Sequence, residues 1–259
     1  MGTASGYKRG MLAPLPQRVP RAVEYPDSDG QRMADNTLQY EWIVTIKGGI
    51  DSEIPDFVGG DLLWYPVEWH PEIRVAPDVL VALGRPKGHR GSYRQWEEQG
   101  VAPQVVFEIL SPGNRFPEMQ KKLQFYQKYG VQEYYLYDPD GNHLFGWIRQ
   151  GDRLVEIAEM DGWLSPLLGI RFEDAADKLH IFHKDGTPFL SFAELTAQAR
   201  EATAQAQEAT AQAREAAARA EQAESRAEQA ESRIAEERRR AEEAMARVAA
   251  LEATLRALG

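Results

Sequence analysis

The segments APDVLVALG (residues 76–84) and VVFEILSPGNR (residues 105–115) decide the fold expected for this chain. Each contains an apolar run of strand length that is rich in β-branched residues. Each run also carries one carboxylate, Asp78 in the first and Glu108 in the second. Burying an unpaired charge costs several kcal/mol. We therefore expect each acid to have a partner or to bind a metal ion.

The composition predicts a cytoplasmic protein without a membrane anchor. A length of 259 residues suggests one or two domains, and 43% hydrophobic residues suffice for a sizeable core. The chain has no cysteine, which excludes disulfides, thiolate metal sites and cysteine nucleophiles and fits a reducing cytosol. The first 20 residues lack the apolar run of a signal peptide, and no later stretch has the length of a membrane helix.

The net charge of −10 does not favour a tight, non-specific DNA-binding protein. Residues 191–259 contain 10 Arg and 13 Glu, a net charge of −3, and residues 1–190 carry the remaining −7. This balance still allows an enzyme that contacts DNA through a local basic patch near an acidic metal site.

The pattern of the first 190 residues predicts an α/β (α+β) domain. Residues 1–33 are rich in Pro and Gly, so we expect an extended or disordered arm, and a domain over residues 34–190 follows it. Asp35 or Asn36 would cap a helix over residues 37–48, with Leu38, Trp42 and Ile46 on one face. Strands are expected at 57–67, 78–84 and 104–110, a helix at 117–130, and a three-strand meander at 131–157.

The segment 191–259 is a separate Ala-rich helix with a seven-residue repeat. With Ala199 at position a of the heptad, the a and d positions are almost all apolar up to Leu258. This is the pattern of a coiled coil, and its larger residues begin at Ile234. A solitary solvated helix is the alternative. We expect a homo-oligomer, most simply a dimer, formed through these heptads, through the folded domain or through both.

The two acids could form a metal site if their strands are neighbours in register, because side chains alternate between the faces of a sheet. Two carboxylates and a backbone carbonyl are the hard oxygen donors that Mg²⁺ prefers. A nearby lysine would stabilise the charge that develops on a phosphate. For Asp78 alone, the alternative is a turn residue after Pro77 that starts a strand.

The segments PDVLV, VVFEILSPGNR and KKLQFYQKYGVQEYYLYDPD together resemble the Uma-two family of endonucleases in the PD-(D/E)XK superfamily. The resemblance covers about residues 57–150. It implies a restriction-endonuclease-like mixed central sheet flanked by helices. It also implies an Mg²⁺- or Mn²⁺-dependent endonuclease that hydrolyses DNA and leaves 5′-phosphates. By the resemblance, Asp78, Glu108 and the backbone carbonyl of Ile109 would hold the metal.

The lysine does not stand where the superfamily usually has it. That position, two residues after the acid, is Leu110. By the family resemblance, the lysine lies instead on the following helix, at the position of Lys122, four residues before Tyr126. Lys121 should point elsewhere, and Glu118 would share the face of Lys122. An ordinary solvated lysine is the alternative for Lys122.

Further residues could assist the site. The resemblance implies an acid from the first helix, for which Asp35 and Glu41 are candidates, whereas Asp61 fits a structural role. Possible phosphate contacts lie in the basic segment GRPKGHRGSYRQW (84–96) and in SPGNR (111–115), both of which are equally explained as loops. These contacts are Arg85, Lys87, Arg90, Arg94, Ser111, Asn114 and Arg115. The alternative function is a catalytically inactive nuclease fold that serves as an interaction module assembled by its coiled coil.

Overall fold

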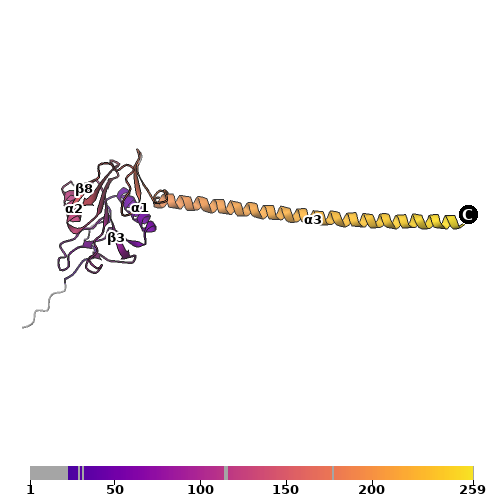
Figure 1. Cartoon of the computed structure of the whole chain (residues 1–259), viewed down its shortest axis with the longest axis horizontal. Helices are drawn as coiled ribbons and strands as arrows, with labels where there is room; N and C mark the ends of the chain where they lie inside the picture. Colours follow the sequence, from indigo (N-terminus) through magenta and orange to yellow (C-terminus); the bar gives the residue numbers. More distant parts are fainter. Residues whose placement is uncertain (1–22, 29, 31, 114–115, 177, 259) are drawn as a thin grey trace, which may run out of the picture. The chain divides into compact units, whose positions relative to one another are not determined.

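Residues 23–28, 30, 32–113, 116–176 and 178–258 are described by the structure, a computed structural model of the chain. The chain divides into two compact units, one ending at Phe192 and the other beginning at Ala193 (Figure 1). None of the helices described is long and apolar enough to cross a membrane.

The first unit is built on a mixed sheet with the strand order β1-β3-β5-β6-β7-β8. The strands β5 and β6 pair in parallel, and the crossover between them contains the helix α2 (Phe116–Tyr129). The other neighbours pair antiparallel. The strands are β1 (Asp56–Gly60), β3 (Val79–Pro86), β5 (Val105–Ile109), β6 (Glu133–Asp138), β7 (His143–Gln150) and β8 (Arg153–Glu156). The predicted mixed α/β fold and the three-strand meander are therefore confirmed.

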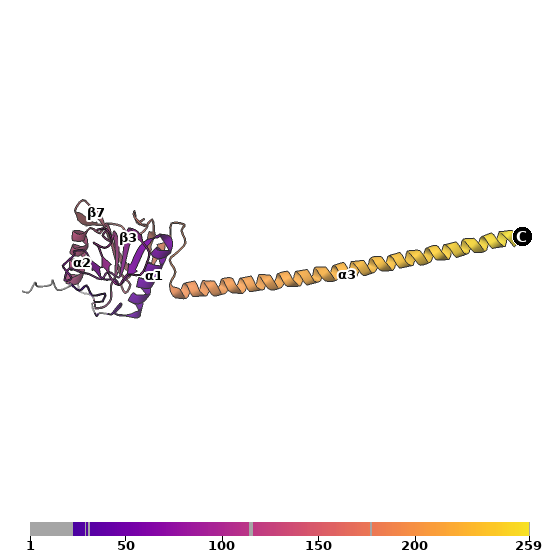
Figure 2. The same cartoon turned by 90° about the horizontal axis from the view of Figure 1, so that it is seen from below.

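The two faces of this sheet are covered by different helices, with the sheet between α2 and α1 (Thr37–Glu53) (Figure 2). Val79, Val81 and Phe107 face the core that contains α1. Leu80 and Val106 face the core that contains α2. Because side chains alternate along each strand, both faces of β5 are packed and all five of its residues are buried.

The predicted strand at 57–67 is wrong as a single element. The strand β1 ends at Gly60, and a short strand β2 (Trp64–Tyr65) follows, which pairs in parallel with β4 (Tyr93–Arg94). Asp61 breaks the run with a φ of 45°, in the left-handed region that Asp tolerates better than most residues. Its N–H donates to the carbonyl of Asp78 at 3.0 Å, so the chain leaves the sheet beside that residue.

The helix α1 begins as predicted, and its buried face overlaps the predicted one: Ile46 is buried and Trp42 packs against the core, but Leu38 is exposed. Asn36 caps it, because its side-chain oxygen accepts a hydrogen bond from the N–H of Gln39 at 2.8 Å. The buried residues are Gln39, Ile43, Ile46 and Ile50, whereas Leu38 is exposed. Their spacing of four, three and four residues is the pattern of a core-facing helix. The prediction missed Gln39, because a polar residue at the first position of this face gives no hydrophobic signal.

Two further segments complete the first unit. The hairpin of β9 (Arg171–Asp174) and β10 (Leu179–Phe182) adds Phe172 and Ile181 to the core on the α1 side. In the described part of the predicted arm, Tyr25 packs against Tyr65 and Trp96, with ring centroids 5.3 and 4.9 Å apart. These residues of the arm therefore pack on the small sheet of β2 and β4.

The second unit consists of the helix α3 (Phe192–Leu258, 67 residues) from Ala193 onward. All of its described side chains from residue 197 onward are exposed. Ion pairs between residues four apart, such as Glu215 with Arg219 and Glu236 with Arg240, lie along its surface. The coiled coil stays a prediction, because a single copy of the chain does not test it.

A buried carboxylate fixes β6 to the loop that precedes β9. Glu133 is buried in the sheet, and its carboxylate accepts hydrogen bonds from the hydroxyls of Tyr135 (2.9 Å) and Ser165 (2.5 Å) and from the N–H of Leu167 (2.8 Å). The Tyr135 hydroxyl in turn accepts a hydrogen bond from the indole of Trp163 at 3.1 Å. Removing this carboxylate would leave several buried donors without an acceptor.

We expect Glu133→Ala to lower the free energy of unfolding of the first unit by about 2–4 kcal/mol, because it leaves buried donors unsatisfied. The measurement is urea unfolding followed by tryptophan fluorescence. All six Trp residues precede residue 192, so the signal reports on the first unit alone. The exposed Glu156→Ala on β8 serves as the control and should change stability by less than about 0.5 kcal/mol. Equal effects of the two variants would contradict this account of Glu133.

Candidate active site

The register between β3 and β5 brings two acids together on the α2 side of the sheet. Leu80 pairs with Val106 and Val79 with Phe107, so continuing the register by one residue places Asp78 opposite Glu108. Both side chains are buried, with 8% of Asp78 and 3% of Glu108 exposed. Strand alternation gives them the same face as Leu80 and Val106, which is the face that α2 covers.

Two residues of α2 bind the carboxylate of Glu108. The ammonium of Lys122 donates to Oε2 at 2.7 Å, and the hydroxyl of Tyr126 donates to Oε1. Residues four apart lie on one face of a helix, so a single turn of α2 engages both oxygens. The exposed fraction of the Lys122 side chain is 19%, whereas Lys121 is exposed and points elsewhere. Leu110 packs against the core on this side of the sheet, so the usual strand position of the lysine holds an apolar contact.

The charge of Lys122 is held in place by the acids around it. Burial of the ammonium on its own would lower the pKa of Lys122, but the carboxylates of Glu108 and Asp78 outweigh burial and raise it. The more distant charge of Glu118, which is itself exposed, acts in the same direction. Lys122 is therefore a cation at neutral pH.

Asp78 is the less well compensated of the two acids. One of its oxygens accepts a hydrogen bond from the backbone N–H of Ile109 at 2.6 Å. Burial, and after it the charge of Glu108, raise the pKa of Asp78 well above its ordinary value, although Lys122 and the Ile109 N–H act in the opposite direction. Two carboxylates thus share one ammonium in a site of low polarity.

The backbone carbonyl of Ile109 is held from α1. The side-chain amide of Gln39 donates to this carbonyl at 2.8 Å, while its oxygen accepts the N–H of Asp35 at 2.8 Å. The carboxylate of Asp35 accepts a hydrogen bond from the hydroxyl of Ser111 at 2.5 Å. The start of α1 therefore fixes the end of β5. Sequence reasoning missed Gln39, because an amide on an apolar helix face gives no signal until its partner is known.

A second tyrosine lies near the acids. Tyr134 packs on Tyr126 with ring centroids 5.1 Å apart. Burial raises the pKa of Tyr134, and the charges of Glu108 and Asp78 raise it further. Among the side chains that the structure describes, its buried hydroxyl has no hydrogen-bond partner. Buried hydroxyls normally have one, so this group is a donor suited to a bound water or ligand oxygen.

These residues fit the requirements of one hard divalent cation. The carboxylates of Asp78 and Glu108 and the carbonyl of Ile109 are oxygen donors, and each keeps lone pairs beyond the hydrogen bonds described. Burial, and after it the charge of Glu108, raise the pKa of Asp78, and a bound cation would act in the opposite direction by favouring its ionised form. Within the described ranges, no group of three or more His, Cys, Asp or Glu side chains is arranged to hold a metal ion, so a carbonyl would have to complete the donor set.

The other predicted accessory residues lie in different places. Asp35 is near the end of β5 through Ser111, whereas Glu41 is exposed on α1, outside the buried face that carries Gln39. Asp61 lies beside Asp78, and its charge adds to the rise in the pKa of Asp78. The predicted phosphate contacts Asn114 and Arg115 lie outside the described residues.

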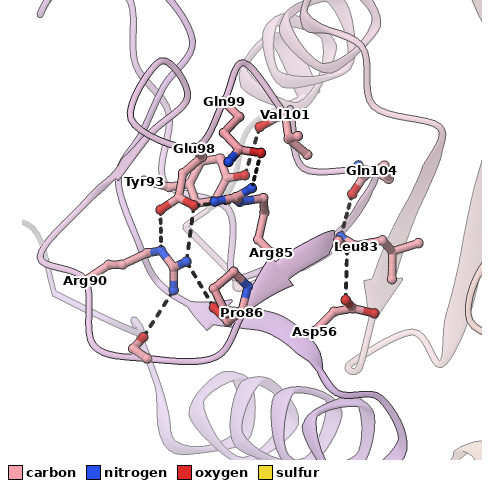
Figure 3. A network of polar contacts seen from close by, with 12 residues as sticks. Asp56, Leu83, Arg85, Pro86, Arg90, Tyr93, Glu98, Gln99, Val101 and Gln104 are labelled. Carbon is pink, nitrogen blue, oxygen red and sulfur yellow. Dashed lines mark hydrogen bonds and ion pairs between the residues drawn. The ribbon is translucent and has the colours of Figure 1, made fainter.

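The basic segment 84–96 is engaged in ion pairs within the domain. Figure 3 shows Glu98 between Arg85 (2.9 Å) and Arg90 (2.5 Å), and Arg90 also lies over the ring of Phe57. The three charged side chains of this cluster are each less than 15% exposed. A buried pair keeps its geometry, so these two arginines contribute to the fold. Their predicted role as phosphate contacts stays a prediction.

Two more basic residues of the segment are also paired. Lys87 binds Asp51 with an N–O distance of 3.0 Å. Arg94 contacts Glu97 at 3.3 Å and Asp27 at 3.8 Å, and its guanidinium lies over the ring of Tyr25. Each of these charges has a carboxylate partner, which reduces its attraction for a phosphate.

Comparison with known proteins gives a matching family model and similar solved structures. Residues 53–176 match the model of the Uma2 family, whose description is "Putative restriction endonuclease". A crystal structure of a putative nuclease belonging to DUF820 from Anabaena variabilis ATCC 29413 is similar, with 20% sequence identity and a TM-score of 0.34. The similarity covers 50% of this chain and 69% of that chain. No curated protein matches the sequence.

We expect Asp78→Asn to raise the thermal stability of the metal-free protein at pH 8 and not at pH 4. The pKa of Asp78 in the folded state lies above its ordinary value of about 3.9. The wild type therefore loses stability as the pH rises from the ordinary pKa through the raised one, because Asp78 ionises less readily in the folded state. Asparagine carries no charge and still accepts from Ile109. A gain of about 1 kcal/mol corresponds to a Tm increase of roughly 2–4 °C.

The measurement is the Tm at both pH values, followed by tryptophan fluorescence in a chelating buffer. Asp138→Asn, a change of the same kind at the partly exposed end of β6, is the control. A lower Tm of Asp78→Asn than of the wild type at pH 8 would contradict the expected relief of charge repulsion.

Proposed function

Because residues 53–176 match a family model described as "Putative restriction endonuclease", we propose that this protein is a Mg²⁺-dependent endonuclease that hydrolyses phosphodiester bonds of DNA. The observation that carries the proposal is the proximity of two buried acids, Asp78 and Glu108, to one partly buried lysine of α2, Lys122, which pairs with Glu108. A purely structural role would be served better by equal charges, because an excess buried charge destabilises a fold.

Asp78, Glu108 and the carbonyl of Ile109 would hold the cation, which is Mg²⁺ or Mn²⁺. When bound, the cation supplies positive charge against the phosphate oxygens on which negative charge develops during hydrolysis. The protein contributes fixed donors: the Ile109 N–H orients Asp78, and the amide of Gln39 orients the Ile109 carbonyl. Such hydrogen bonds keep ligand oxygens in place before substrate arrives.

Lys122 would orient the attacking water or a phosphate oxygen. Its ammonium has three N–H donors, of which one is used by Glu108, so donors remain for a second oxygen. The raised pKa keeps the group protonated, so it acts as a donor and an electrostatic stabiliser rather than as a base at neutral pH. Tyr126 completes the position of Glu108 from the same face of α2. Attack of the water in line with the leaving 3′-oxygen would break the P–O3′ bond and give a 5′-phosphate and a 3′-hydroxyl.

Lys122→Met should lower plasmid nicking in Mg²⁺ by about 10²- to 10³-fold, because one fixed donor to the transition state is lost. Its binding of Mg²⁺ should be kept or become tighter, because removing a cation leaves two acids with more uncompensated charge. Lys121→Met is the matched control, since Lys121 is the exposed neighbour and carries the same charge. The measurements are agarose-gel nicking rates and calorimetric Mg²⁺ titrations of the full chain.

Asp78→Asn and Glu108→Gln should lose both nicking and Mg²⁺ binding, which separates them from Lys122→Met. Undiminished nicking in both acid variants would disprove the site. A wild-type protein that neither nicks DNA nor binds Mg²⁺ or Mn²⁺ would instead support the catalytically inactive interaction module.

A further inference from the structure

One face of the last part of α3 exposes large apolar side chains. Ile234, Met245, Val248 and Leu251 are between 51% and 72% exposed. In the heptad frame that begins at Ala199, Ile234 and Val248 occupy a, Leu251 occupies d and Met245 occupies the neighbouring e position. A stripe of this kind on an otherwise polar helix is normally covered by a partner.

The charged residues on the two sides of this stripe have mostly opposite signs. The g positions of five successive heptads are all arginine, and three e positions of the same region are glutamate. The g residues are Arg219, Arg226, Arg233, Arg240 and Arg247, and the glutamates are Glu224, Glu231 and Glu252. In a parallel pair of helices, a g residue meets the e residue of the next heptad of the partner.

From this charge pattern we infer that the partner is a second copy of this chain, paired with α3 in a parallel, in-register, two-stranded coiled coil. The register sets Arg219 against Glu224, Arg226 against Glu231 and Arg247 against Glu252. Symmetry forms each pair twice. Arg233 meets Arg238 in the same register, and this is the one unfavourable g–e contact.

An antiparallel pair does not have this complementarity. In antiparallel coiled coils the g residues of the two helices face each other, so residues 219–247 would bring arginine against arginine in any alignment that overlaps them. Like charges at these positions cost as much as opposite charges gain. The sequence therefore selects the direction of pairing.

A polar layer selects the register. Glu237 occupies a d position within the seam, with Arg233 at the preceding g and Arg238 at the following e. In register, the two glutamates lie among four arginines, which also offsets the contact between Arg233 and Arg238. A shift by one heptad would place Glu237 against Ala230 or Ala244. One such layer fixes register at some cost in stability.

The size of the seam residues indicates where affinity comes from. The a and d positions from residue 199 to 230 are alanine, which buries little area in each layer. From residue 234 on, the larger seam residues include Ile234 and Val248 at a and Leu251 and Leu258 at d, and β-branched a residues with Leu at d favour two strands in parallel coiled coils. Association should therefore depend on residues 234–258.

The first experiment tests direction and register with the full chain. The protein has no cysteine, so Ala230→Cys and Ala244→Cys, made separately at d positions, provide single thiols. In a parallel, in-register dimer both variants should form a disulfide-linked dimer on oxidation. A fixed antiparallel alignment can bring only one of these positions near its counterpart, because the two lie about 21 Å apart along the helix. Cross-linking of only one variant, or of neither, would overturn the proposal.

The second experiment tests the charge pairs. Glu224→Arg with Glu231→Arg places arginine opposite arginine, so the dimer dissociation constant should rise about tenfold or more. Glu221→Arg with Glu228→Arg is the matched control, because it makes the same charge change at b positions, away from the seam. The measurement is sedimentation equilibrium at several concentrations. A monomeric wild-type chain, or equal dissociation constants of the two double variants, would overturn the proposal, whether or not the protein cuts DNA.

Discussion

The burial of two neighbouring carboxylates, Asp78 and Glu108, is the constraint on which the candidate site of the first unit depends. Asp78 directly precedes β3 and Glu108 lies in β5, where the continued register sets them opposite each other. Both are buried, so a few fixed donors take the place of water around them. Lys122 compensates Glu108, while Asp78 receives mainly a backbone N–H. Ionised Asp78 would therefore add a second buried negative charge, and burial together with the charge of Glu108 raises its pKa. A fold selected for stability alone would not keep this arrangement.

The same constraint explains why the lysine comes from a helix. The strand position two residues after Glu108 points to the α2 side as well, but Leu110 there packs into the core. An ammonium that reaches Glu108 must therefore come from the element that covers this face. In α2, Lys122 and Tyr126 stand one turn apart, so one helix turn binds both oxygens of Glu108. The displaced lysine is thus a consequence of the packing on this face.

The sequence predicted the parts of the site that follow from local pattern. A charge in an apolar run of strand length pointed to Glu108 and Asp78, whereas Lys122 was found only through the resemblance to the Uma-two family. Contacts between residues far apart in the sequence could not be predicted. Gln39 contributes to the site only because α1 packs where the Gln39 amide can donate to the carbonyl of Ile109. In the same way, the left-handed backbone of Asp61 ends a strand that the hydropathy pattern had predicted to continue. Arg85 and Arg90, which were predicted to contact phosphate, form ion pairs with Glu98. Hydropathy and residue spacing predict the structure of one element at a time, whereas the roles of these residues depend on contacts between two elements.

The charge balance has a consequence for how such a site would engage DNA. Residues 1–190 are acidic overall, and Arg85, Arg90, Lys87 and Arg94 are paired with carboxylates of the same unit. Long-range attraction of a polyanion is therefore weak, since it depends on uncompensated positive charge. The remaining attraction must act at short range, where the ammonium of Lys122 and a divalent cation held by the two acids would face the phosphate. Under the proposed function, the cation would thus contribute to DNA binding as well as to hydrolysis. The two carboxylates that repel each other would hold the cation that attracts the phosphate.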